Sequence, residues 1–224
     1  MEAKMADPNY THIAFILDRS GSMQSIADDM NGGIRAILKE EAERSAAEGK
    51  LVLVDVTLFD NEVIQTQQSV SIEAADASIA PRGGTALYDA VGITLASLNR
   101  RLNRELPEEE RPSRVVVIIV TDGKDNSSTE WSAGGVSVLV EKCTKQHNWE
   151  FLFLAANIDA NAVGESIGMS AEGTISFQPN RKGVGQVGGS IVATIRGYDP
   201  NEGKSAVYPK DTPTSPDSTP VAPH

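Results

Sequence analysis

The residues with the clearest chemical potential lie in the stretch DRSGS at positions 18–22, directly after the apolar run of residues 12–17. Asp18, Ser20 and Ser22 place one carboxylate and two hydroxyls at alternate positions of a tight turn. Oxygen donors without nitrogen or sulfur favour hard cations such as Mg²⁺. The stretch therefore predicts a cation site where a strand ends.

Two further polar stretches lie, like the first, beside predicted elements of secondary structure. RGGT at residues 82–85 precedes a helical pattern, and TDG at residues 121–123 follows the apolar run of residues 114–120. In an open parallel sheet, ligands gather outside the carboxyl ends of the strands. We therefore expect Thr85 and Asp122 to meet the first stretch at one edge of a sheet.

Short apolar runs alternate with helical patterns along the chain, which predicts an α/β fold: a Rossmann-like, doubly wound, mostly parallel central sheet with helices on both faces. The residues Phe59-Asp60-Asn61 indicate a hairpin turn, and hence one antiparallel edge strand. The expected strands are 12–17, 51–59, 63–71, 114–120, 151–155 and 174–177. The expected helices include the apolar stripes of 26–38, 87–102, 136–143, 160–167 and 184–195.

The length of 224 residues suits one domain with a well-filled core. We expect an N-terminal extension at residues 1–11, the domain at residues 12–197 and a tail at residues 198–224. The tail is rich in Pro, Ser, Thr and Asp and poor in apolar residues, so it is predicted to be disordered.

Charge and composition narrow the classes of partner and the location. A net charge of −11 argues against sequence-independent binding to nucleic acid or to an anionic membrane surface. No stretch approaches the ~20 apolar residues of a membrane helix, so we expect no membrane insertion. The first residues lack a secretory signal pattern, and the single cysteine, Cys143, agrees with a reducing compartment. These features favour a cytoplasmic protein.

The order and spacing of the three stretches resemble the metal-ion-dependent adhesion site of the von Willebrand factor type A (vWA) domain family. The resemblance covers about residues 12–197, and the fuller text GGTALYDAVG and TDGKDNSS is similar to stand-alone bacterial and phage members. It implies that Ser20, Ser22 and Thr85 supply hydroxyl oxygens to Mg²⁺, with Mn²⁺ or Ca²⁺ as alternatives. Asp18 and Asp122 would supply charge directly or through water.

The resemblance also implies a function in protein binding. The ion would keep one coordination position open, and an Asp or Glu carboxylate of an unidentified partner protein would fill it. A haloacid-dehalogenase-like phosphate-ester hydrolase is the alternative, because those enzymes also place an Asp at the end of the first strand. They need a second Asp two positions later, where this chain has Ser20. The sequence therefore favours binding without catalysis, and a structural or virion-associated role is the third possibility.

Other polar residues near these stretches have more than one interpretation. Asp89 lies four residues after Thr85 on the same helix face, where it would reach a metal-bound water or the 18–22 turn, or simply face solvent. Ser22, Ser25 and Thr85 are also suited to cap helices. The remaining candidates are assigned to the hairpin turn and to the loop rim: Asp60, Asp125 and Asn126.

Overall fold

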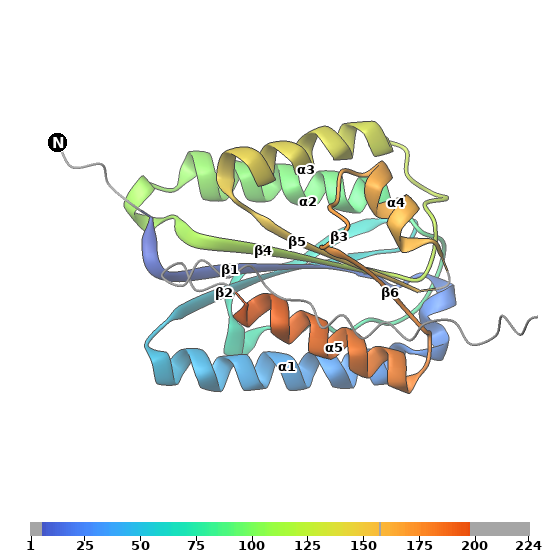
Figure 1. Ribbon diagram of the computed structural model, residues 1–224, viewed down its shortest axis with the longest axis horizontal. Coiled ribbons are helices and arrows are strands. Elements are labelled where there is room, and N and C mark those ends of the chain that lie inside the picture. Colours follow the sequence, from blue (N-terminus) through green and yellow to red (C-terminus); the bar gives the residue numbers. More distant parts are fainter. Residues whose placement is uncertain (1–5, 157, 198–224) are drawn as a thin grey trace, which may run out of the picture.

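A six-stranded sheet forms the centre of the computed structural model, which describes residues 6–156 and 158–197 (Figure 1). The strand order is β3-β2-β1-β4-β5-β6. β1 pairs in parallel with β2 and β4, β4 with β5, and β5 with β6, whereas β3 is antiparallel to β2. The predicted mixed sheet with one antiparallel edge strand is confirmed. The strands are β1 (Asp7–Asp18), β2 (Leu51–Phe59), β3 (Val63–Ser71), β4 (Pro112–Thr121), β5 (Glu150–Ala156) and β6 (Thr174–Phe177).

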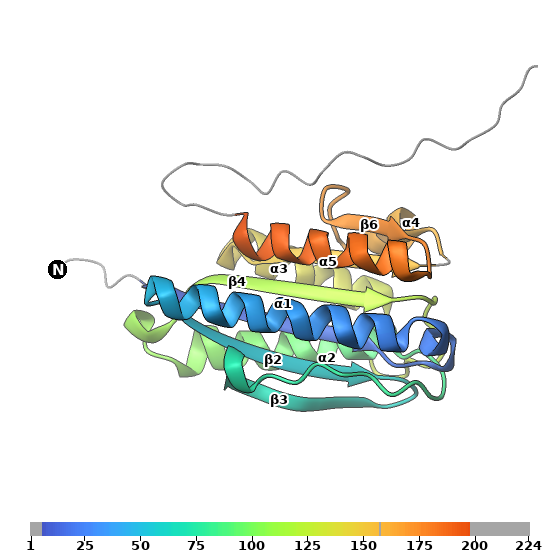
Figure 2. The same cartoon turned by 90° about the horizontal axis from the view of Figure 1, so that it is seen from below.

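Helices cover both faces of the sheet (Figures 1 and 2). α1 (Ala27–Glu48) and α5 (Arg181–Arg196) lie on one face. α2 (Leu87–Arg100), α3 (Ala133–His147) and α4 (Ala160–Ser166) lie on the other. None of the helices in the described ranges has the length and apolar character needed to cross a membrane.

The apolar periodicity of the sequence corresponds to two cores, one on each face. Ile13, Phe15 and Leu17 of β1 pack on the α1 side, whereas Ala14 and Ile16 pack on the α2 side. A strand covered on both faces has no solvated side, which explains its continuous apolar text. The predicted helix stripes are buried in the same two cores, including Met30, Ile34, Val91, Leu95 and Leu98.

The first strand begins at Asp7, within the stretch 1–11 that the sequence suggested as an extension. Tyr10 pairs with Leu51 and is buried, so these residues belong to the sheet. The polar sequence around Pro8 lacks the apolar alternation of a strand, and pairing with β4 at Asp7 and with β2 from Tyr10 overrides that weak local signal. The expected disordered tail at 198–224 lies outside the described residues.

A buried polar network lies on the α2 side of the sheet. His12 contacts the Tyr10 hydroxyl through Nδ1 at 2.7 Å and Asp55 through Nε2 at 3.0 Å. Asp55 also accepts a hydrogen bond from the Ser69 amide at 2.7 Å and pairs with Arg101, at the start of a π-helical turn. Burial raises the pKa of Asp55, but the hydrogen bonds and the charge of Arg101 outweigh it and hold the pKa below its ordinary value.

The strand order reverses beside β1, which is flanked by β2 on one side and β4 on the other. Leu17 of β1 pairs with Val120 of β4, so these two strands end side by side. The loops that follow them leave the same edge of the sheet at the point where ligands bind in doubly wound folds. This edge therefore brings the 18–22 and 121–123 stretches together.

Candidate metal centre

Asp18 is the last residue of β1 and is fully buried. Its Oδ1 accepts a hydrogen bond from the Ser20 amide, and its Oδ2 accepts one from Thr121 Oγ1, both at 2.6 Å. Thr121 is the last residue of β4, so the carboxylate is fixed between the two strands. Thr121 is the first residue of the TDG stretch, and its contact with Asp18 depends on two strands that end side by side, which local sequence does not indicate.

Ser20, Ser22 and Asp122 form a chain of hydrogen bonds. Ser22 Oγ donates to Asp122 Oδ1 at 2.6 Å, and Ser20 Oγ lies 3.0 Å from Ser22 Oγ. Ser20 and Asp122 are buried, whereas Ser22 is exposed. Two stretches that are distant in sequence therefore converge, and the cluster opens to solvent at Ser22.

Thr85 joins the same cluster from the loop before α2. Its side chain is buried, and a Cβ atom on Gly123 would lie 3.4 Å from Thr85 Oγ1. The Thr85 amide donates to Asn126 Oδ1 at 2.9 Å, and the Asn126 amide donates to the Thr85 carbonyl at 2.9 Å. Asn126 therefore holds the second stretch against the loop that follows the TDG stretch, beyond the rim position expected for it.

The alternative role of these hydroxyls as helix caps has no support in the described residues. Ile26 occupies the N-cap position of α1, and Ala86 that of α2, neither with a side-chain capping bond. Ser22 and Ser25 instead lie inside a 3₁₀ turn that precedes α1. The hydroxyls of Ser22 and Thr85 are therefore not engaged as caps.

The carboxylates of the cluster are buried, and one of their oxygens is unsatisfied. Asp122 Oδ2 has no hydrogen-bond partner among the described residues. Burial raises the pKa of Asp18, as does the charge of Asp122, against the hydrogen bonds from Thr121 and Ser20. Burial also raises the pKa of Asp122, against the hydrogen bond from Ser22. An unpaired buried carboxylate is costly, and a cation is the group that removes this cost.

The donor set fits a hard divalent cation. Two carboxylates and three hydroxyls supply oxygen alone, which suits Mg²⁺ better than a soft metal. No group of three or more His, Cys, Asp or Glu side chains arranged to hold a metal occurs in residues 6–156 and 158–197. Any metal site at this edge is therefore completed by hydroxyl oxygens. A bound ion would supply a positive centre able to attract an anionic oxygen.

Asp89 hydrogen-bonds to the loop after the TDG stretch. Its carboxylate accepts hydrogen bonds from three consecutive amides, those of Thr129, Glu130 and Trp131, at 2.7, 2.9 and 2.6 Å. The expected hydrogen bond to the 18–22 turn is replaced by these three. Asp89 thus fixes the loop that runs from the TDG stretch to α3, because backbone amides there lie within its reach.

The hairpin between β2 and β3 lies closer to the cluster than the sequence indicated. Asn61 Oδ1 accepts a hydrogen bond from the Gly84 amide at 2.7 Å, beside Gly83 with its left-handed φ of 69°. A Cβ on Gly83 would lie 2.3 Å from Asn61 Oδ1, so a larger residue there would displace the hairpin. Such long-range contacts leave no signature in local sequence.

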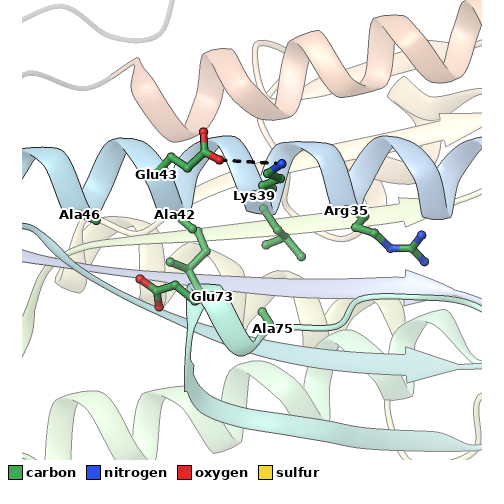
Figure 3. Close-up of a pocket in the computed structure, with 9 residues that line it drawn as sticks. Arg35, Lys39, Ala42, Glu43, Ala46, Glu73 and Ala75 are labelled. Atoms are coloured by element: carbon green, nitrogen blue, oxygen red, sulfur yellow. Dashed lines mark ion pairs between the residues drawn. The ribbon is translucent and has the colours of Figure 1, made fainter.

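A groove between α1 and the 3₁₀ turn Ile72–Ala74 is separate from this cluster (Figure 3). Leu38, Ala42 and Ile72 are its buried lining residues, and Lys39 and Glu43 form an exposed ion pair at its rim. Its volume is about 430 Å³. None of its lining residues belongs to the three stretches, so it is not part of the candidate metal centre.

Comparisons with known proteins define the fold class. No protein-family model and no curated protein sequence matches the chain. Proximal thread matrix protein 1 from the mussel byssus, in a structure with a zinc-occupied MIDAS motif, is similar with a TM-score of 0.56 and 20% identity, over 83% of this chain and 45% of that chain. A von Willebrand factor type A protein from Catenulispora acidiphila is similar with a TM-score of 0.53 and 16% identity, over 86% and 44%.

Manganese-loaded TRAP protein from Plasmodium vivax is also similar, with a TM-score of 0.54 and 16% identity over 78% of this chain and 70% of that chain. The chain spans about half the length of the mussel and Catenulispora structures. The chain therefore has the vWA fold, as the resemblance of its three stretches implied.

Proposed function

We propose that this protein is a non-enzymatic interaction module that holds Mg²⁺ between Asp18, Ser20, Ser22, Thr85 and Asp122 and binds a carboxylate of a partner protein through that ion. The proposal rests on one observation: Asp122 Oδ2 is buried and has no hydrogen-bond partner among the described residues, at the place where three polar stretches converge. A divalent cation there would compensate both buried carboxylates at once.

The composition of the cluster supports an ion that stays available to a partner. Mg²⁺ prefers six oxygen ligands and commonly keeps several waters. Two carboxylates and three neutral hydroxyls leave the ion electrophilic, so an anionic oxygen is favoured in place of a water. Ser22 is the exposed member of the set, which supports entry of the partner carboxylate on its side.

The similar structures support a divalent cation in general terms. One is described with a zinc-occupied MIDAS motif and another as manganese-loaded. The assignment of Mg²⁺ rests on the oxygen-only donor set of this chain. The absence of catalysis rests on Ser20, which stands where the hydrolase alternative needs a second carboxylate as acid or base.

The net charge limits the kind of partner. At −11, the protein repels an acidic surface at long range. The partner carboxylate should therefore lie among basic or neutral neighbours, and association should weaken with added salt because long-range attraction is screened.

Isothermal calorimetry of Mg²⁺ binding tests the metal half of the proposal. The unaltered protein should bind one ion per chain, and Asp122→Ala should abolish binding, whereas the control Asp76→Ala should bind normally because Asp76 lies on an exposed loop. Mg²⁺ binding that survives Asp122→Ala would place the ion elsewhere.

Affinity capture from cell extract tests the partner half. A partner should be retained in Mg²⁺ and released by chelator, and the same partner should be lost in the Ser20→Ala variant. Circular dichroism should stay unchanged, because the apolar cores do not depend on the ion, unlike a small zinc domain. A partner held equally in excess chelator and by Ser20→Ala would show that another face binds it.

A further inference from the structure

The β2–β3 hairpin makes ionic contacts with two of the three stretches through one carboxylate. Asp60 is only 2% exposed, and its Oδ2 accepts a hydrogen bond from Arg82 Nε at 2.6 Å and lies 2.9 Å from Arg19 Nε. Arg19 belongs to the 18–22 stretch and Arg82 to the 82–85 stretch. Asp60 therefore links the first and second stretches directly.

Backbone hydrogen bonds reinforce the same junction. The Arg19 amide donates to the Phe59 carbonyl at 2.8 Å, and the Arg82 amide donates to the Arg19 carbonyl at 2.6 Å. The Ala86 amide donates to the Asp60 carbonyl at 2.7 Å, at the start of α2. Three segments distant in sequence thus share one short ladder whose ionic side chain is Asp60.

Asn61 extends the junction to the loop that follows the TDG stretch. Its Oδ1 accepts from the Gly84 amide at 2.7 Å, and its Nδ2 donates to Ser127 Oγ at 3.2 Å. The Ser127 amide in turn donates to the Thr85 carbonyl at 3.2 Å. The hairpin therefore contacts every loop that supplies an oxygen to the candidate metal centre.

The charge of Asp60 matters as well as its contacts. Arg19 is mostly buried, with 12% of its side chain exposed, so solvent screens its charge poorly. Burial raises the pKa of Asp60, but the hydrogen bonds and the arginine charges outweigh it and lower the pKa, so the carboxylate stays ionised. Without that carboxylate, the Arg19 guanidinium would lose its ionic partner beside a cation site, and Arg82 would keep only its exposed pair with Glu62 at 3.3 Å.

We propose that Asp60 and Asn61 form a clasp that positions the three metal-binding loops, with Asp60 acting through Arg19 and Arg82. This inference rests on the proposed function and adds positioning residues to it. Residues that orient metal ligands without touching the metal typically change affinity 10- to 100-fold when they are replaced. The contacts that make up the clasp do not include the ion, so the ordering of the loops is measurable without metal.

The test compares Asp60→Asn with Asp76→Asn. Asp60 Oδ1 accepts a hydrogen bond from the amide two positions on, that of Glu62, at 2.8 Å. Asp76 is a matched control because its Oδ1 accepts bonds from Ser78, also two positions on, but it lies exposed and pairs with no arginine in the described residues. Amide hydrogen exchange in chelator should be at least about 10-fold faster at Arg82 and Ala86 in Asp60→Asn. Asp76→Asn should leave those two amides unchanged.

Mn²⁺ serves as the metal probe, through its enhancement of water-proton relaxation. Asp60→Asn should bind Mn²⁺ about 10-fold more weakly or worse, with an unchanged circular dichroism spectrum. The double variant Asp60→Asn/Arg82→Gln also removes one of the two guanidinium charges that face Asp60. The double variant should still bind Mn²⁺ weakly, because the clasp is still missing. Full recovery of Mn²⁺ affinity would show a purely electrostatic effect and overturn the positioning role.

Other results have distinct meanings. Faster exchange with unchanged Mn²⁺ affinity would show that Asp60 holds the hairpin without positioning the metal centre, and would overturn the inference. Unchanged exchange would overturn the clasp itself. If the unaltered protein takes up no Mn²⁺, the proposed function fails together with the metal-positioning role, and the exchange data then decide only whether Asp60 orders the loops.

Discussion

Replacing Asp122 by Asn should have opposite effects on stability with and without metal. In the metal-free protein, Asp122 Oδ2 is buried without a partner among the described residues, near the buried Asp18 carboxylate. Asn keeps the shape of the side chain and removes one of the two negative charges. The metal-free variant should therefore be more stable than the unaltered protein, although it loses a proposed metal ligand.

The magnitude follows from the burial of that oxygen. A buried polar atom without a partner costs about 1–3 kcal/mol, and more when it is charged. Asn places an uncharged amide nitrogen at the same position, so only the part of the cost that comes from the charge is recovered. We expect that part to be about 1–2 kcal/mol, which corresponds to a melting temperature roughly 2–8 °C higher for a domain of this size. Mg²⁺ at a hundredfold excess over its dissociation constant should stabilise the unaltered protein by about 2.7 kcal/mol and the variant not at all. The order of stability should therefore reverse when Mg²⁺ is added.

Thermal unfolding followed by circular dichroism, in chelator and in Mg²⁺, measures both effects. Asp159→Asn is the control, because it removes the same charge and Asn also caps a helix well, as Asp159 does for α4 by accepting from the Ala162 amide. It should behave as the unaltered protein does in both buffers. Asp122→Asn melting lower in chelator would refute the cost assigned to the buried oxygen, and a retained gain from Mg²⁺ would refute Asp122 as a ligand.

Three further predictions concern the surroundings of the site. Asp55→Ala should lower the free energy of unfolding by about 3–5 kcal/mol in urea titrations, because it leaves the half-buried Arg101 and the buried His12 without their carboxylate partner. Because the pKa of Asp55 is lowered, its contribution to stability is complete above the ordinary pKa of 3.8 and is lost as pH falls through the lowered pKa. The difference in unfolding free energy between the unaltered protein and Asp55→Ala should therefore narrow in acid, and a difference that stays constant with pH would contradict this. Asp89→Ala should speed hydrogen exchange of the amides at 129–131, and unchanged rates would show that other contacts hold that loop. Ser20→Ala should weaken Mg²⁺ binding severalfold with an unchanged melting temperature in chelator; equal affinity in calorimetry would remove Ser20 from the ligand set.

Much of the fold could be predicted because it depends on local patterns. The strands at 51–59, 63–71 and 174–177 have the bounds predicted from the sequence. The apolar stripes of the helices could be predicted because burial of one face of a helix imposes an apolar repeat near 3.6 residues. The start of β1 could not be predicted, because residues 7–11 are mostly polar and their place in the sheet depends on pairing with β2 and β4.

The sequence by itself determined the candidate oxygen donors and their order, and it placed the 18–22 and 121–123 stretches at strand ends, because residue type and strand periodicity are local properties. Only the tertiary structure decided what lies beside them. Thr121 fixes Asp18 because two strands end in register, and Asp89 turns to the amides of 129–131 because α2 and that loop meet in space. Asp60 became a link between loops for the same reason: its arginine partners are distant in sequence, and only the folded chain brings the three charges together.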